Sequence, residues 1–155
     1  MDKIDYRILE CLKKNARMST SAIGETINMS VSAVSERIRR LENSGVISQY
    51  TTILDRNKIG QDIKAFIMLR IENPEFYSNT IEDMIRRDPH ILEGHMLAGD
   101  FDYMLKVVTK STQSLEQLIY AIKSTKGVQY TKTMIVLSTM KEDVTVLPDA
   151  EMILK

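Results

Sequence analysis

The chain lacks the features that mark secreted, membrane-spanning and disulfide-stapled proteins. Its 155 residues include a single cysteine, so no intrachain disulfide is possible, and we expect Cys11 to pack as a small apolar side chain in a reducing compartment. No run of 18 apolar residues occurs, and the N-terminus begins with a charged amphipathic segment instead of a signal peptide. These absences predict a soluble, cytoplasmic protein with no membrane partner.

An excess of charge of one sign is also missing. The 21 basic residues balance 21 acidic ones, giving a net charge of zero. The balance is uneven along the chain, because residues 1–58 carry ten basic against seven acidic residues, and residues 59–155 carry eleven against fourteen. A small basic excess in the first part suits a phosphate-contacting module, although it is far from the strongly basic footprint that predicts DNA binding unaided.

Signatures of catalysis are scarce as well. His90 follows a proline in an expected loop, and His95 lies within an expected strand. Neither histidine has a nearby cysteine or the spacing of a metal site, so we expect His95 to be structural. No phosphate-binding glycine loop or nucleophile motif occurs. The sequence therefore predicts no catalytic residue, no metal and no cofactor, and a protein that is not an enzyme.

What the first 45 residues contain is three short amphipathic segments. Apolar residues recur at helical spacing in each: Ile4, Ile8 and Leu12 in the first, Ala22, Ile23 and Ile27 in the second, and Val34, Ile38 and Leu41 in the third. Ser19 and Ser30 stand where N-caps of the last two helices belong, and Gly45 stands where the third would end. Three helices with a tight turn between the last two predict a helix-turn-helix. A plain helical bundle with a solvated charged face is the alternative.

The third segment has the pattern of a DNA recognition helix, because its outward side carries short polar residues and arginines. The residues expected at the DNA are Ser30, Ser32, Ser35, Glu36, Arg37, Arg39 and Arg40. Arg39 is the best candidate for base contact, since arginine bonds guanine through two hydrogen bonds, while Glu36 either accepts from cytosine or holds a neighbouring arginine. Arg37 and Arg40 flank the outward face and suit phosphates. The alternative for these arginines is pairing within the helix, with Glu36 or Glu42.

The remainder of the chain alternates between strand and helix patterns. Residues 46–54 are rich in β-branched and aromatic side chains, which predicts a strand followed by a linker to residue 60. Beyond it, strands are predicted at 63–71, 91–98, 103–109 and 128–139, with helices at 74–87 and from 112 to about 126. The order β-α-β-β-α-β is the ferredoxin-like plan, so the fold class is α+β. We divide the chain into a helix-turn-helix domain (residues 1–47), a hinge strand and linker (residues 48–61) and a ferredoxin-like domain (residues 62–155).

Both helices of that plan cover one side of the sheet, which leaves the other side without a cover. Phe66 and Met68 are expected to face away from the helices, together with either Met134 and Val136 or Thr133, Ile135 and Leu137. Exposed apolar area of this size predicts dimerisation of one sheet against another. The alternative is a monomer whose sheet is wet on one side.

Several motifs in register resemble those of one known family. In the first half they are Asp5-Tyr6-Arg7-Ile8-Leu9, Asn15-Ala16-Arg17, Ser30 with Arg37 to Glu42, Gly45-Val46-Ile47 and Tyr50; in the second half they are Gly99 to Val107, Gly127-Val128, Thr131, Thr133 and Val136-Leu137. With them the chain resembles the Lrp/AsnC, or feast/famine, transcriptional regulators of bacteria and archaea over nearly all of its length. The resemblance implies a winged-type helix-turn-helix, a hinge strand and a ferredoxin-like domain that dimerises and assembles into octamers.

The resemblance also implies an effector site, where a small metabolite, usually an amino acid, binds between dimers near the turn Gly99-Asp100-Phe101-Asp102. The carboxylates of Asp100 and Asp102 suit an ammonium group, and backbone N–H groups beside Gly99 suit a carboxylate. The alternative is that these residues only form a hairpin turn.

The function predicted from the sequence is that of a sequence-specific DNA-binding transcriptional regulator modulated by an amino acid or related metabolite. Its partners are expected to be double-stranded DNA, the small effector and further copies of the chain. Two alternatives stay open. One is an architectural protein that wraps DNA without an effector, and the other is a haem-pathway decarboxylase, which has a similar two-domain plan.

Overall fold

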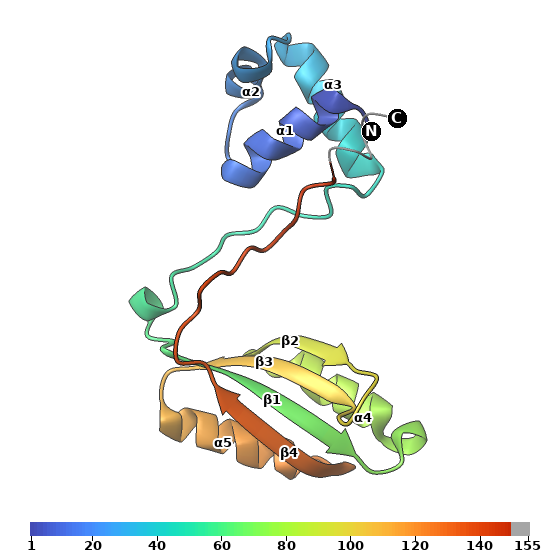
Figure 1. Cartoon of the computed structure of the whole chain (residues 1–155), viewed down its shortest axis with the longest axis vertical. Helices are drawn as coiled ribbons and strands as arrows, with labels where there is room; N and C mark the ends of the chain where they lie inside the picture. The colour runs from blue at the N-terminus through green and yellow to red at the C-terminus, as the bar shows by residue number, and fades with distance from the viewer. Residues whose placement is uncertain (150–155) are drawn as a thin grey trace. The chain divides into compact units, whose positions relative to one another are not determined.

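The computed structural model describes residues 1–149, which form two compact units (Figure 1). The first unit contains residues 1–52 together with residues 141–149, and the second contains residues 53–140. The sequence places residues 62–155 in one domain, whereas the structure groups residues 141–149 with the helical unit. The last part of that predicted domain, residues 150–155, lies outside the described residues.

The first unit contains the three predicted helices, α1 (Lys3–Lys14), α2 (Thr20–Ile27) and α3 (Val31–Asn43). Both predicted serine caps are confirmed, because the Ser19 hydroxyl accepts a hydrogen bond from the N–H of Ala22 and the Ser30 hydroxyl accepts one from Ala33. Asn28, in the left-handed conformation at φ 60°, ends α2 and begins the turn into α3. These local signals determine where the helices begin and end.

The helices enclose a small apolar core. Its buried members come from all three helices: Ile8, Cys11, Ile23, Ile27, Val34 and Leu41. Gly24 is needed in α2 because a Cβ atom there would lie 2.6 Å from the carbonyl oxygen of Met29. The turn can therefore fold closely against α2, which fixes how α3 leaves it. Each buried aliphatic side chain contributes about 1.5–3 kcal/mol, enough for a three-helix unit to hold its shape.

The strand predicted for residues 46–54 is wrong for this chain, since no residue between Gly45 and Asp55 belongs to a strand. β-Branched residues favour an extended backbone, but a strand also needs a hydrogen-bonded neighbour, and this segment has none within residues 1–149. The Tyr50 hydroxyl instead donates to Glu42 over 2.9 Å, which ties the segment to the end of α3. Burial, aided by that hydrogen bond, raises the pKa of Tyr50 to about 12. A short 3-10 helix, η1 (Asn57–Ile59), follows.

The second unit has the predicted βαββαβ order. Its elements are β1 (Ile63–Ile71), α4 (Pro74–Arg87), β2 (Ile91–Met96), β3 (Tyr103–Thr109), α5 (Thr112–Lys123) and β4 (Val128–Ile135). The strands form an antiparallel sheet in the order β2-β3-β1-β4, so β2 and β4 are its edges. Both edge strands end earlier than predicted, at Met96 and Ile135.

Alternate residues of the central strands bury one face of the sheet under α4 and α5 (Figure 1). Ile67 and Leu69 of β1 and Leu105 of β3 are fully buried against Ile81 of α4 and Leu118 of α5. The alternation predicted for residues 63–71 is therefore confirmed, and it aims the remaining side chains of β1 at the opposite face.

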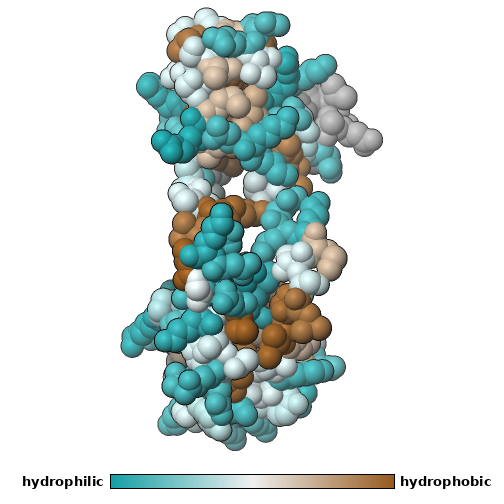
Figure 2. Space-filling view, turned by 90° about the vertical axis from the view of Figure 1, so that its left-hand side faces the viewer, coloured by the Kyte–Doolittle hydropathy of each residue, from teal (hydrophilic) through white to brown (hydrophobic). Residues whose placement is uncertain are grey.

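That opposite face, called here the open face, carries Phe66 and Met68 as predicted. Phe66 is the register partner of Met134 in β4, so Met134 lies on the open face as well. Of the two predicted sets for that strand, the one that contains Met134 is therefore correct. Met68 is the register partner of Met104 in β3, and both are partly exposed. Figure 2 shows hydrophobic side chains, in brown, at the surface of this unit. No helix within residues 1–149 is long and apolar enough to cross a membrane.

Candidate nucleic-acid interface and effector hairpin

The outward side of α3 presents side chains that have no partner among residues 1–149. Ser35, Glu36 and Arg39 are exposed, and within residues 1–149 none of their side chains has a hydrogen bond or ion pair. Val34 and Leu41, on the other side of the same helix, are buried in the core. The helix is thus held by one side while its polar side stays available to a ligand.

Two of the predicted serines have structural contacts. The Ser30 hydroxyl caps α3, and it also lies 3.1 Å from the hydroxyl of Ser32. Ser30 therefore begins the helix whatever else it contacts, and Ser32 extends the same polar surface at the first turn.

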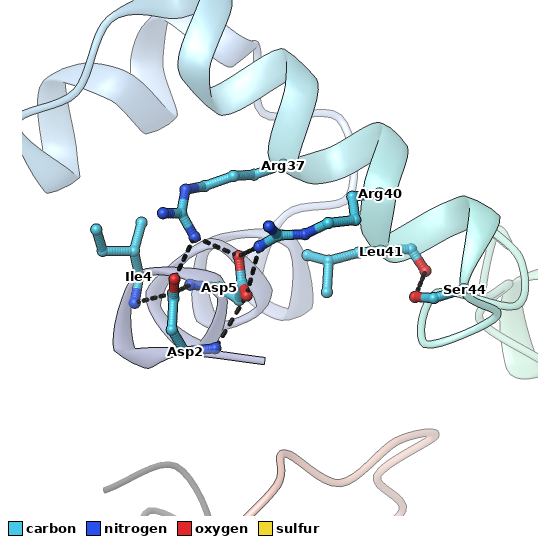
Figure 3. A network of polar contacts seen from close by, with 7 residues as sticks. All are labelled: Asp2, Ile4, Asp5, Arg37, Arg40, Leu41 and Ser44. Carbon is cyan, nitrogen blue, oxygen red and sulfur yellow. Dashed lines mark hydrogen bonds and ion pairs between the residues drawn. The ribbon is translucent and has the colours of Figure 1, made fainter. Parts of the chain in front are cut away.

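Arg37 and Arg40 project from α3 toward the start of α1, where they meet two aspartates (Figure 3). The Arg37 Nη1 atom lies 2.6 Å from Asp2 Oδ2 and 2.8 Å from Asp5 Oδ1. The Arg40 Nη2 atom lies 2.9 Å from Asp5 Oδ2. The alternative of pairing within α3 is therefore wrong, because both arginines pair with another helix.

The same aspartates cap α1. The Asp2 carboxylate accepts hydrogen bonds from the N–H groups of Ile4 and Asp5, and Asp5 accepts one from the N–H of Asp2, which is a capping box. Asp5 is only 1% exposed. Burial raises the pKa of Asp5, but hydrogen bonds from the Asp2 backbone and Arg37 outweigh it, so the pKa lies below its usual value. The pKa of Asp2 is lowered, chiefly by Arg37, and the pKa of Arg37 is raised in return.

The two arginines differ in how much of them remains exposed. The Arg37 side chain is 22% exposed and is neutralised by two carboxylates, whereas the Arg40 side chain is 60% exposed and shares only Asp5. Arg40 therefore retains donors that face solvent, and Arg37 is largely committed to joining α1 to α3.

The aspartates of this network escaped the sequence reasoning. Two acidic residues three positions apart before an apolar run are a visible capping-box signal. Their pairing with Arg37 and Arg40, more than 30 positions away, had no signal in the sequence, because it depends on how α1 crosses α3.

The second candidate site is the hairpin between β2 and β3. Its presence confirms the turn predicted there. Asp102 is bound at three points: its N–H donates to the carbonyl of Leu69 over 2.8 Å, its carbonyl accepts from Leu97, and its carboxylate accepts from the N–H of Ile71 over 2.7 Å. Asp102 therefore fastens the loop to the end of β1.

Arg70 strengthens this attachment and had not been predicted. Its Nε and Nη2 atoms donate to the carbonyl of Asp100 over 3.2 and 2.9 Å, and its guanidinium lies 5.8 Å from the centre of the Phe101 ring. Phe101 stacks on Tyr130, the register partner of Arg70, at 6.2 Å. No spacing in the sequence indicates this cluster, because the β1–β4 pairing creates it.

Asp100, another of the four predicted effector residues, projects into solvent. Its side chain is exposed and has no hydrogen bond or ion pair within residues 1–149. Phe101 and Asp102 are occupied by the contacts above, and Gly99 leaves open space around the turn. The hairpin thus presents one carboxylate and bare backbone on a rigid support.

Each histidine lies beside a carboxylate on its own segment. His95 is on the open face, half exposed, with its Nε2 atom 3.3 Å from a carboxylate oxygen of Glu93. Within the described part of the chain, no three His, Cys, Asp or Glu side chains are arranged to hold a metal ion.

Comparison with known protein families decides the assignment of both units. Residues 1–48 match the winged helix-turn-helix DNA-binding model, and residues 64–146 match the Lrp/AsnC ligand binding domain. The chain belongs to the Lrp/AsnC family of transcriptional regulators. It therefore contains a DNA-binding unit and a ligand-binding domain of that family, in an α+β fold, as the sequence predicts.

Curated Lrp/AsnC relatives match along most of the chain. The transcriptional regulator FL11 of Pyrococcus furiosus is 34% identical over 142 residues, which is 92% of this chain and 93% of the relative. LrpB of Bacillus subtilis is 35% identical over 119 residues, covering 77% and 78%. These relatives are transcriptional regulators, so the prediction that the chain is not an enzyme is confirmed, and the decarboxylase alternative is withdrawn.

Solved Lrp/AsnC structures share the fold. A Neisseria meningitidis regulator in complex with L-methionine is 25% identical and superposes with a TM-score of 0.93, covering 98% of this chain and 99% of the other. LrpC of B. subtilis is 32% identical, with a TM-score of 0.82 and coverage of 91% and 97%.

Proposed function

We propose that this Lrp/AsnC regulator acts in the cytoplasm and reads a specific DNA sequence by placing the outward side of α3 in the major groove. The observation that carries the proposal is the contrast along α3, where Ser35, Glu36 and Arg39 lack partners in the described part of the chain while the opposite side is buried. An α-helix fits the major groove, and short polar residues let its backbone approach the bases.

Each residue of the site has a distinct role in this proposal. Arg39 contacts a guanine, Glu36 accepts from a cytosine or orients Arg39, and Ser32 and Ser35 contact base edges or nearby phosphates. Ser30 positions the helix. Arg40 contacts a phosphate through the donors that Asp5 does not use, because 60% of its side chain is exposed. Arg37 has a structural role, since Asp2 and Asp5 neutralise it.

Selection from a random duplex library tests sequence-specific binding. The full-length protein is expected to enrich one short motif and to bind it at least about 10³-fold more tightly than random duplex DNA at fixed salt. A pool that stays random, with equal affinity for all duplexes and steep salt dependence, would favour the architectural alternative.

We also propose that an amino acid is the effector and that it binds at the Gly99–Asp102 hairpin between dimers. The N. meningitidis relative was solved with L-methionine, which supports this class of ligand. Asp100 suits the ammonium group because its carboxylate is exposed and has no ion pair with any residue that the structure describes. Asp102 positions the loop, because one of its carboxylate oxygens accepts the Ile71 N–H, and its other oxygen keeps acceptor capacity for the same ammonium group.

A thermal-shift screen of the full-length protein against the twenty amino acids tests the effector proposal. A ligand that binds only the folded protein raises the melting temperature by mass action. Asp100→Ala is expected to abolish the shift, while Asp62→Ala, an exposed aspartate of the same unit, is expected to keep it. A flat screen, or a shift that survives Asp100→Ala, contradicts the proposal.

A further inference from the structure

One large apolar residue of α3 faces solvent. Val31 is the first residue of the helix and is 50% exposed. The other large apolar residues of α3 point inward, because Val34 and Leu41 are buried and Ile38 packs against the core. A half-exposed valine adds little to packing, and its branched side chain is a weaker helix former than a straight one. Folding alone therefore gives no reason for a valine at this position.

Val31 lies beside the polar side of α3, in line with residues that we propose contact bases. Ser35 follows it by four positions and Arg39 by eight, so the three side chains occupy successive turns along one strip of the helix surface. Ser35 and Arg39 are exposed as well. A duplex that lies along these two polar side chains therefore also meets Val31.

The chemistry of a valine side chain selects one group in the major groove. Recognition helices contact base edges with their N-terminal residues, and Val31 lies at that end of α3. All base pairs present hydrogen-bonding groups there, but thymine alone among the four bases adds an apolar group, its C5 methyl. Valine has no side-chain donor or acceptor. Its methyl groups instead remove the thymine methyl group from water, which is favourable for both apolar surfaces.

We propose that Val31 contacts the C5 methyl group of a thymine and so determines the preferred base at one position of the DNA site. The contact rests on the proposed function, in which α3 enters the major groove. Val31 precedes Arg39 by eight positions, which is about 12 Å along the helix axis. Successive base pairs are about 3.4 Å apart. The thymine therefore lies at a different base pair from the guanine of Arg39, within about four base pairs of it.

The contact is small in energy, but it discriminates between bases. Burying one methyl group changes a binding constant about fourfold. Cytosine lacks the methyl group, and at the same position it places its amino donor against an apolar side chain that cannot accept a hydrogen bond. Thymine is therefore preferred over cytosine by more than the methyl group alone provides.

Replacing thymine by deoxyuridine, which lacks only the methyl group, tests the contact. The full-length protein first selects its motif from random duplexes, and each thymine of that motif is then replaced singly. At one thymine the replacement is expected to weaken binding of the unaltered protein about fourfold. Val31→Ala is expected to bind the thymine duplex about fourfold more weakly than the unaltered protein does, and to bind the thymine and deoxyuridine duplexes almost equally.

Val46→Ala is the matched control, because Val46 is also half exposed, at 49%, but lies beyond the end of α3. This variant is expected to keep the preference for thymine over deoxyuridine, and circular dichroism melting establishes that both variants fold. A motif without thymine, thymines that all tolerate deoxyuridine, or a preference that survives Val31→Ala overturns the Val31 contact while sequence-specific binding stands. A pool that stays random overturns both proposals.

Discussion

At the level of single residues, the carboxylate of Asp5 joins α1 to α3 within the DNA-binding unit. Its buried carboxylate receives hydrogen bonds from Arg37, from Arg40 and from the N-cap of α1. A buried carboxylate is tolerated only when its charge is matched in this way. The same contacts orient two arginines of α3, so one side chain both caps α1 and holds α3 against it.

Replacing this carboxylate gives the first prediction. Asp5→Asn is expected to lower the unfolding free energy of the helical unit by about 3 kcal/mol at pH 7, because it leaves Arg37 and Arg40 without their shared charge partner. Hydrogen exchange of the α1–α3 amides in the full-length protein measures the loss. Glu25→Gln, an exposed acid on α2 without a partner in residues 1–149, is the control and should leave exchange unchanged.

The pH dependence of that stability follows from the lowered pKa values of Asp2 and Asp5. Because each folded-state pKa lies below the ordinary 3.8, their contribution is present above that pH and is lost as the pH falls through the folded value. In Asp5→Asn, the unfolding free energy of the helical unit should therefore fall less steeply as the pH is lowered. If the unfolding free energy of Asp5→Asn falls as steeply at low pH as that of the unaltered protein, this account is contradicted.

At the scale of residues, the sequence predicted what depends on near neighbours. Ser19, Ser30 and Gly45 act where they were expected, because a cap bonds within three positions of itself. The clamp of Arg70 and the pairing of Asp5 were missed, since both join residues about 30 positions apart. The attachment of Asp102 to Ile71 was missed for the same reason, and its predicted contact with a ligand stays a prediction.

At the scale of elements, Gly127 shows how one backbone position fixes a packing arrangement. It has φ +97°, its carbonyl accepts from Glu72, and a Cβ atom on it would lie 2.5 Å from the Cβ of Tyr77. The start of α4 therefore packs directly on the turn that leads into β4, and only glycine fits there.

Two alanine variants separate the cost of a positive φ from the cost of a steric clash between the added Cβ atom and a neighbouring residue. Gly127→Ala is expected to lower the unfolding free energy by more than about 2 kcal/mol, because it adds a clash to an unfavourable φ. Gly60→Ala, at φ +70° with open space around it, should lose only about 1 kcal/mol. Urea denaturation monitored on the sheet unit compares them, and equal losses would contradict the role of Tyr77.

Element boundaries were predictable where a periodic pattern and a stop signal coincide, as in β1 and β3. The segment after Gly45 shows the converse, because its β-branched residues predicted a strand that no neighbour completes. Strand formation depends on a partner elsewhere in space, and composition alone does not supply one.

At the scale of the whole molecule, the open face is the surface that we propose joins two copies into a dimer. Phe66 lies near its middle, flanked by register partners in β3 and β4. Phe66→Glu is expected to produce monomers that keep the native circular dichroism spectrum, because a charge replaces a large apolar contact. Thr139→Glu, at an exposed position outside the sheet, is the control, and a Phe66→Glu protein that stays dimeric excludes this face.

The function of the whole molecule was predictable because motifs from both units agree with one family. Assembly was less predictable, because it depends on contacts between separate copies of the chain. The open face followed from alternation in β1.

The central claim is that the unpartnered side of α3 reads bases, and Arg39→Ala tests it most directly. Affinities of this variant and of Arg40→Ala are measured, at several salt concentrations, for the selected duplex and for random duplex DNA. Arg39→Ala should weaken specific binding by about 1–3 kcal/mol and relax one base-pair preference, while random DNA binds almost as before; Arg40→Ala should weaken both and reduce the salt slope by about one. Equal losses on both duplexes for Arg39→Ala, or no loss on either, would contradict the account.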